Sequence, residues 1–85
     1  MVKTISITLK LFAVYRDCYG EDTQQRIVPD NATVSDVLDQ LISEQPQLAK
    51  WRSLTRFGVN YQFVPPETIL NAGDEVVFIP PVSGG

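Results

Sequence analysis

The residues best suited to chemistry in this sequence stand at its end, where Val82 and Ser83 are followed by Gly84 and Gly85. Neither glycine carries a Cβ, so this segment can enter a narrow channel and adopt backbone angles that other residues avoid. A terminal glycine also presents an unhindered carboxylate, which becomes an electrophile once a partner attaches a leaving group to it. We therefore expect Gly85 to be the reactive residue, acting outside any pocket of its own chain.

The residues before the glycines favour an extended tail. Pro80 and Pro81 remove two backbone donors and disfavour helix. We therefore predict a folded domain over residues 1–81 and a flexible tail over residues 82–85. The alternative is that the two glycines are accidental, in which case the chain would be a plain interaction domain.

The composition excludes several classes of catalyst. The chain contains no histidine and one cysteine, Cys18, so a Ser-His-Asp triad, a histidine metal site and an iron–sulfur cluster with four thiolates cannot form. No glycine-rich loop of a phosphate-binding type occurs. We expect this chain to bind no metal and no cofactor, and not to be an enzyme on its own.

Charge and hydrophobicity point to protein partners. Ten acidic residues outnumber seven basic ones, for a net charge of -3, whereas a nucleic-acid-binding domain needs a basic face. No apolar run approaches the ~20 residues of a membrane span, and the lone cysteine suits a reducing compartment. We expect a cytoplasmic protein that binds neither nucleic acid nor membrane, with partners that present basic docking surfaces.

Two strands are expected in the first third of the chain. Apolar and polar residues alternate over residues 3–13, which predicts a half-buried strand. Its inward residues would be Ile5, Ile7, Leu9, Leu11 and Ala13. A second strand is predicted over residues 24–28, so that residues 14–23 would form the long loop of a hairpin.

The next segment predicts the main helix. Thr33 and Asp36 stand at the spacing of a capping box, and the helix would end before Pro46. Its apolar stripe consists of Val34, Val37, Leu38, Leu41 and Ile42, spaced for one helix face. A short helical turn is expected over residues 46–54, with Trp51 at the edge of the core.

The remaining strands complete a mixed sheet. We predict a strand over residues 56–64 with a turn near Asn60, and a last strand over residues 75–79. A helix between strands allows the last strand to lie parallel to the first. The fold class is therefore α+β, of the β-grasp or ubiquitin-like type, with four to five strands and one main helix on one face.

Four segments resemble the small subunits of molybdopterin synthase. They are Leu11–Asp17, similar to LFAxxR[DE]; the pair Val59-Asn60; Gly73–Val76, which reads GDEV; and Phe78–Gly85, similar to FxPPVxGG. The resemblance implies a sulfur carrier. An adenylating enzyme would use ATP to activate Gly85, sulfur would replace the adenylate, and the large synthase subunit would use the thiocarboxylate to build the dithiolene of molybdopterin.

Two alternatives remain beside this resemblance. A sulfur carrier for thiamin synthesis would share the chemistry, although such chains are usually shorter and lack the LFAxxR[DE] and Pro-Pro-Val features. A ubiquitin-like modifier would join Gly85 to lysines of other proteins, although this tail lacks a basic lead-in.

One set of apolar residues is predicted to dock partners. Phe12 falls on the polar side of the first strand's alternation, and Ile79 on the outer side of the last strand. If these strands are parallel neighbours, both residues lie where the tail leaves the domain, and Phe63 is a candidate third member. Clustered exposed apolar side chains mark interaction sites, so we expect them to contact the large subunit and the adenylating enzyme.

Overall fold

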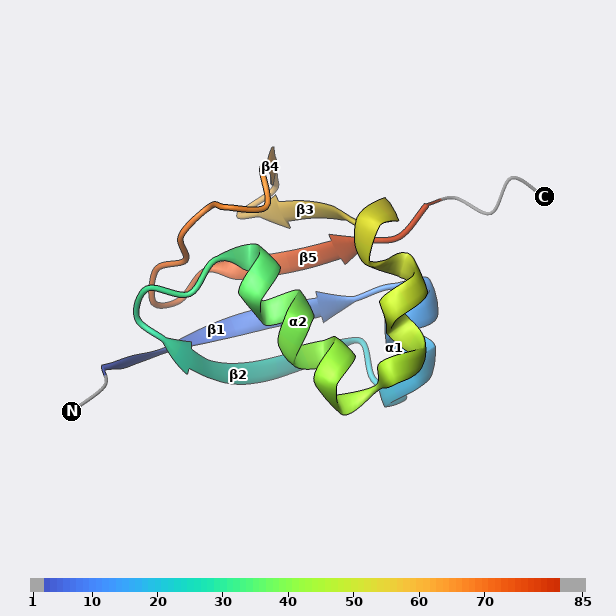
Figure 1. Cartoon of the computed structure of the whole chain (residues 1–85). Helices are drawn as coiled ribbons and strands as arrows, with labels where there is room; N and C mark the ends of the chain where they lie inside the picture. Colours follow the sequence, from blue (N-terminus) through green and yellow to red (C-terminus); the bar gives the residue numbers. More distant parts are fainter. Residues whose placement is uncertain (1–2, 82–85) are drawn as a thin grey trace.

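The computed structural model describes residues 3–81, which form a mixed five-stranded sheet with helices packed against it (Figure 1). The strand order is β2-β1-β5-β3-β4. In chain order the strands are β1 (Thr4–Leu11), β2 (Thr23–Pro29), β3 (Arg56–Val59), β4 (Gln62–Val64) and β5 (Glu75–Ile79).

The centre of the sheet is the parallel pair of β1 and β5. Leu9 lies opposite Val76 and Leu11 opposite Phe78, and these four side chains are buried. The antiparallel partners are β2 beside β1, and β3 beside both β5 and β4. The predicted β-grasp fold and the parallel placement of the last strand are confirmed.

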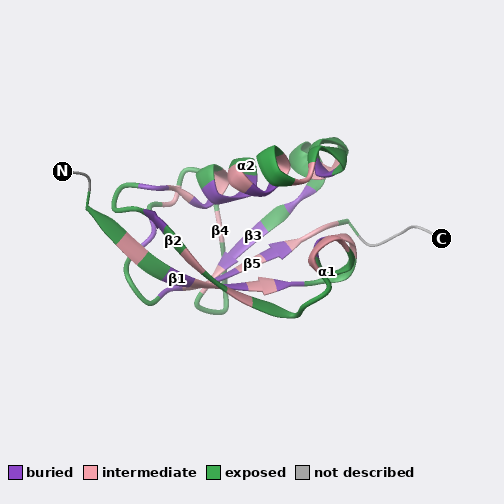
Figure 2. Ribbon diagram, turned by 90° about the horizontal axis from the view of Figure 1, so that it is seen from below, coloured by how far each residue is buried: buried purple, intermediate pink, exposed green. Residues whose placement is uncertain are grey.

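Helix α2 (Val34–Glu44) covers one face of the sheet. The side chain of Thr33 accepts a bond from Asp36 N, and Asp36 Oδ2 accepts one from Thr33 N, at 3.1 and 2.9 Å. This capping box satisfies two backbone donors that a helix start leaves without partners. Figure 2 shows the buried residues of α2 on the side that faces the sheet. The predicted cap and apolar stripe are confirmed.

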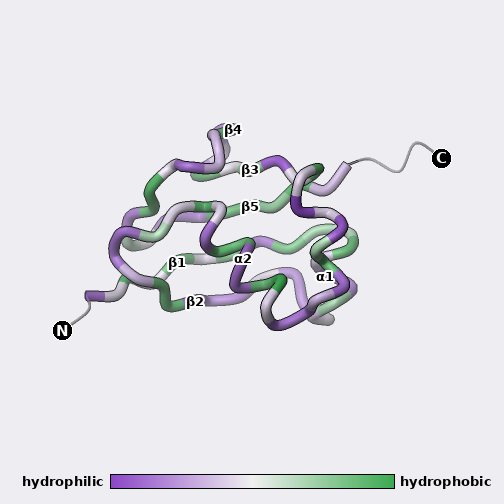
Figure 3. The backbone as a smooth tube through the Cα atoms, in the orientation of Figure 1, coloured by the Kyte–Doolittle hydropathy of each residue, from purple (hydrophilic) through white to green (hydrophobic). Residues whose placement is uncertain are grey.

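The core lies between α2 and the sheet. The ring of Phe78 packs against Tyr15 and Phe57, with centroid distances of 5.7 and 5.5 Å. Figure 3 shows the hydrophobic residues concentrated in the central strands, whereas most of β2 is hydrophilic. The segment after α2 forms the short helix η1 (Pro46–Leu54), in which Trp51 packs at the core edge as expected.

The predicted loop over residues 14–23 is wrong, because helix α1 (Ala13–Tyr19) occupies most of it. β1 ends at Leu11, and Ala13 is exposed at the start of α1 instead of continuing the strand. The helix is short, so tertiary contacts must stabilise it. Its Tyr15 is fully buried and hydrogen-bonded to Thr55, and Gly20 (φ 71°) closes its C-terminus.

A two-residue hairpin turn joins β3 to β4. Asn60 and Tyr61 both have positive φ, 51° and 70°, as a type I′ turn requires. The Asn60 side chain donates to Asp74 Oδ1 and accepts from Glu75 N, both at 3.0 Å. The Val59-Asn60 pair and the Gly-Asp-Glu-Val segment therefore meet in space, and Asp74 and Glu75 serve the turn.

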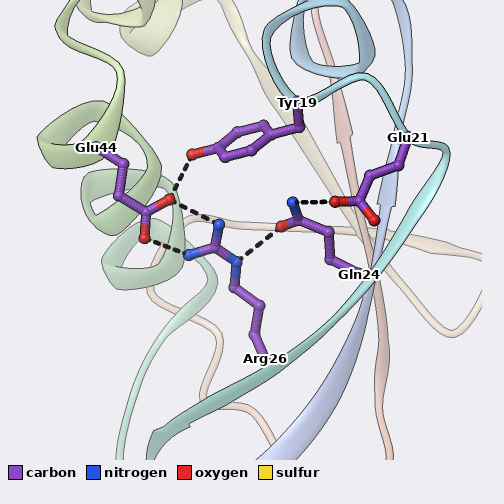
Figure 4. Close-up of polar contacts among 5 residues, drawn as sticks. All are labelled: Tyr19, Glu21, Gln24, Arg26 and Glu44. Atoms are coloured by element: carbon purple, nitrogen blue, oxygen red, sulfur yellow. Dashed lines mark hydrogen bonds and ion pairs between the residues drawn. The ribbon is translucent and has the colours of Figure 1, made fainter.

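A polar cluster joins α1, β2 and α2, as Figure 4 shows. The Arg26 guanidinium donates to both carboxylate oxygens of Glu44 at 2.7 Å, and the Tyr19 hydroxyl donates to the same carboxylate at 2.5 Å. The bonds from Arg26 hold the pKa of Glu44 below its ordinary value of 4.5. Burial, together with the bond to Glu44, raises the pKa of Tyr19 to about 12.

None of the helices within residues 3–81 has the length and apolar character needed to cross a membrane.

Leu38→Ala should destabilise the domain by about 2–5 kcal/mol, because it leaves a cavity between α2 and the sheet. Ser43→Ala, at an exposed position of the same helix, is the control and should change stability by less than about 0.5 kcal/mol. Urea unfolding measures both. Equal losses for the two variants would contradict the packing of α2.

Glu44→Gln should lower the urea midpoint at neutral pH and have little effect in acid. A carboxyl group whose pKa is lower in the folded state than in the unfolded state stabilises the fold when the pH is above the pKa of the unfolded state. This stabilisation is lost as the pH falls through the pKa of the folded state. Because the Glu44 side chain is about half exposed, we expect about 1 kcal/mol or less. The difference from the unmodified chain should shrink as the pH falls below 4.5; a gap independent of pH would contradict this role.

Candidate functional site

The site is built around the end of β5, where the predicted tail begins. Pro80 is half-buried and Pro81 is exposed. Residues 82–85, which include Gly84 and the proposed reactive Gly85, lie outside the described residues. Since β5 is fixed between β1 and β3, its C-terminal end determines where the chain leaves the sheet, at the same end of the molecule as α1 (Figure 1).

An apolar hollow lies beside this point on the outer face of the sheet. Gly58 pairs with Phe63 on one side and with Val77 on the other, so the missing side chain of Gly58 leaves a depression between them. The hollow has a volume of about 150 Å³, and its other lining residues are Tyr61, Gln62 and Ile79. Phe63 is 73% exposed. The structure thus brings two of the predicted docking residues, Phe63 and Ile79, into one hollow.

Phe12 lies outside this hollow, in a separate depression whose lining includes Lys10 and Arg16. Its neighbour Leu11 pairs with Phe78, so Phe12 and Ile79 follow paired residues at the ends of adjacent parallel strands. Phe12 is 52% exposed, as expected. Phe12 lies one residue beyond the end of β1, still in extended backbone (φ -128°, ψ 153°), and is the N-cap residue of α1.

Sequence reasoning missed Tyr61, which is the most exposed large side chain of this surface at 92%. Its hydrogen bond with Glu75 raises the pKa of its hydroxyl. The turn near Asn60 was predicted and is confirmed; a type I′ turn has two exposed central residues, and that signal could have identified Tyr61 as the second of them. We call Phe12, Tyr61, Phe63 and Ile79 the docking patch.

Three basic residues lie near the docking patch: Lys10, Arg16 and Arg56. Arg56 lies opposite Ile79, and Lys10 opposite Val77. Lys10 Nζ lies 3.9 Å from Glu75 Oε1. In the depression that holds Phe12, Arg16 Nε lies 2.6 Å from Asp22 Oδ1. Lys10 and Arg16 are thus paired with carboxylates, and the apolar side chains of this face are bordered by charges of both signs.

The described residues around the patch do not assemble acid–base machinery. Asp74 is buried, but its carboxylate accepts bonds from Asn71 N and from Asn60, which is a structural role. Within residues 3–81, no group of three or more cysteine, aspartate or glutamate side chains is placed to hold a metal ion.

Two solved structures resemble this fold. Small archaeal modifier protein 1 from Haloferax volcanii matches with a TM-score of 0.77 and 29% identity, over 92% of this chain and 99% of that one. A complex of subunits 1 and 2 of the molybdopterin-converting factor from Helicobacter pylori contains a chain that matches with a TM-score of 0.61, over 95% of this chain and 100% of that one. At 21% identity, this second likeness concerns the fold alone.

Comparison of sequences identifies the family. A molybdopterin synthase sulfur carrier subunit from Mycobacterium tuberculosis is 33% identical over 82 residues, which cover 95% of this chain and 99% of that protein. The model of the ThiS family matches residues 9–85, a range that includes every described part of the docking patch and continues to the last glycine. The chain therefore belongs to the ThiS family.

Proposed function

We propose that this chain is the sulfur carrier subunit of a molybdopterin synthase, with Gly85 as the residue that carries the sulfur. The observation that carries the proposal is the extent of the family match, which runs from residue 9 to residue 85 and so includes both terminal glycines. The likeness to a molybdopterin synthase sulfur carrier subunit over 95% of the chain supports the same activity.

The chemistry follows from the glycine carboxylate. A carboxylate resists nucleophilic attack, so an adenylating enzyme first transfers AMP from ATP to Gly85 and releases pyrophosphate. A sulfur donor then displaces AMP and leaves a thiocarboxylate. The large synthase subunit transfers this sulfur to a pterin precursor, and Gly85 returns to a carboxylate when water replaces the sulfur. ATP is consumed by the partner, and this chain needs no cofactor or metal of its own.

The docking patch would hold partners while the tail enters their active sites. Exposed apolar groups that cluster beside a reactive segment mark an interface, and aromatic anchors supply much of the binding energy at such surfaces. We assign Phe12, Phe63 and Ile79 to contacts with the large subunit and with the adenylating enzyme. The catalytic acids and bases belong to these partners, in the cytoplasm, and this chain is a protein cosubstrate.

A second candidate is a ubiquitin-like modifier, which the structural likeness to an archaeal modifier protein favours. Both functions begin with adenylation of Gly85 and differ in the nucleophile that follows. A modifier would be recovered joined to lysine side chains of other proteins, whereas a carrier would not.

Removal of Gly85 should abolish sulfur transfer and leave the domain folded, because the tail lies beyond the last strand of the sheet. Synthase activity in a reconstituted assay with the large subunit and the adenylating enzyme measures transfer, and urea unfolding measures the fold. The full-length chain is the control. Retained activity of the shortened chain would refute the carrier proposal.

Phe12→Lys should weaken binding to the large subunit by about thirtyfold, or ~2 kcal/mol, because it replaces an aromatic anchor at the tail base with a charge. The fold should tolerate it, since Phe12 is already half exposed. Ala72→Lys adds the same charge at an exposed turn before β5 and should change neither property. Titration calorimetry decides: equal affinities for the two variants would remove Phe12 from the interface.

A further inference from the structure

Strand β2 forms an open edge of the sheet. It has seven residues and β1 as its neighbour on one side only. Edge strands present unpaired N–H and C=O groups, and proteins usually protect them with short strands, prolines or lysines. The other edge has such protection, because β4 has three residues and is followed by Pro65 and Pro66. In β2 the only proline is the last residue, Pro29.

The register determines which backbone groups of β2 point outward. The Leu11 N–H donates to the Asp22 carbonyl at 2.8 Å, and the Asp30 N–H donates to the Lys3 carbonyl at 3.0 Å. The backbone N–H and C=O groups of the odd-numbered residues of β1 therefore point toward β2. They pair with the backbone groups of the even-numbered residues of β2. Paired and unpaired positions alternate in an antiparallel ladder. The backbone groups of Gln25 and Ile27 consequently point away from the sheet.

The two sides of this edge differ in chemistry. On the outer face of the sheet, Ile27 exposes 64% of its surface between polar neighbours. On the side of α2, a groove of about 780 Å³ runs between β2 and the helix. Its polar lining includes Glu21, Gln24, Arg26, Gln40, Ser43 and Glu44. A strand added to this edge would place alternate side chains beside Ile27 and in the groove.

The groove has an acidic character. Arg26 is its only cation and is engaged by both oxygens of Glu44, so these two charges balance each other. Glu21 accepts a bond from the neutral amide of Gln24 at 3.0 Å and keeps its negative charge uncompensated within the cluster. Figure 4 shows Glu21 and Gln24 beside the Arg26–Glu44 pair. A ligand side chain entering here would gain most from a positive charge.

We propose that the β2 edge binds an extended segment of a partner protein as an added strand. The segment hydrogen-bonds to the backbone of Gln25 and Ile27, places an aliphatic side chain beside Ile27, and directs a lysine or arginine toward Glu21. Such strand addition obtains affinity from main-chain bonds and specificity from alternate side chains. A second copy of this chain fits poorly. It carries a net charge of -3 and an acidic groove of its own, so the groove of the first copy would repel it.

This surface is distinct from the hollow beside the end of β5, although Phe12 shares a depression with Thr23, the first residue of β2. Strands β1, β5 and β3 separate the β2 edge from the Phe63 side of the docking patch. A partner could therefore occupy the β2 edge while the tail is engaged elsewhere, which would suit a protein that holds the carrier between successive partners.

The test uses the full chain and a blocked peptide in which valine and lysine alternate, monitored by amide NMR at low salt. At saturating peptide, hydrogen exchange of the Gln25 and Ile27 amides should slow by about tenfold or more, with a Kd of about 1 mM or tighter. N-methylation of the peptide residues that pair with β2 should abolish the effect, because it removes their donors without changing the protein.

Glu21→Gln should weaken peptide binding severalfold, and a peptide with glutamate in place of lysine should bind more weakly still. Glu67→Gln removes the same charge from an exposed position between β4 and β5 and should leave binding unchanged. Three results would overturn the proposal: amides of Gln25 and Ile27 that do not respond to the peptide, a response confined to Phe63 and Ile79, or protection that grows with protein concentration in the absence of peptide.

Discussion

The parallel pairing of β1 with β5 is the constraint on which the rest of the structure depends. Parallel neighbours cannot be joined by a tight turn, so the chain must cross the sheet between them, and α2 lies in that crossover with its apolar stripe over the buried side chains of both strands. Parallel strands also end on the same side. The first residue after β1, Phe12, and the chain that follows Ile79 are therefore brought together by backbone geometry.

Alternate side chains of β5 point to opposite faces of the sheet, so one set stabilises the core and the other is available for binding. In β5, Val76 and Phe78 are buried in the core, whereas Val77 and Ile79 line the outer hollow. The outer side chains can therefore be changed without opening a cavity, and a partner can use them without disturbing the fold. Gly58 adds to this arrangement, because a residue without a side chain creates a depression between Phe63 and Val77.

Much of the fold could be predicted because its signals are local. The alternation in β1, the Thr33 cap and the apolar spacing in α2 each lie within a few neighbouring residues. Helix α1 was missed because its anchor is not local: Tyr15 is held by Thr55, 40 residues away in sequence. The spacing of Val14, Tyr15, Cys18 and Tyr19, which pack against or within the core, is the signal that could have revealed it.

The candidate site was predictable to a similar degree. The positions of Phe12 and Ile79 followed from parity and a parallel pair. Tyr61 was missed although the turn near Asn60 was predicted, because the conformation of the turn decides which residue it displays. The cluster of Tyr19, Arg26 and Glu44 depends on contacts between three separate elements. Such contacts have no periodic signature in a sequence. They become visible only when the elements are placed in space.

Mass spectrometry of the C-terminal peptide, from protein isolated from its native host, can show whether Gly85 carries sulfur. We expect a fraction of the peptide to be heavier by the mass difference between sulfur and oxygen, with the change located at the terminal glycine. A peptide found only as the free carboxylate, or joined to lysines of other proteins, would contradict this expectation.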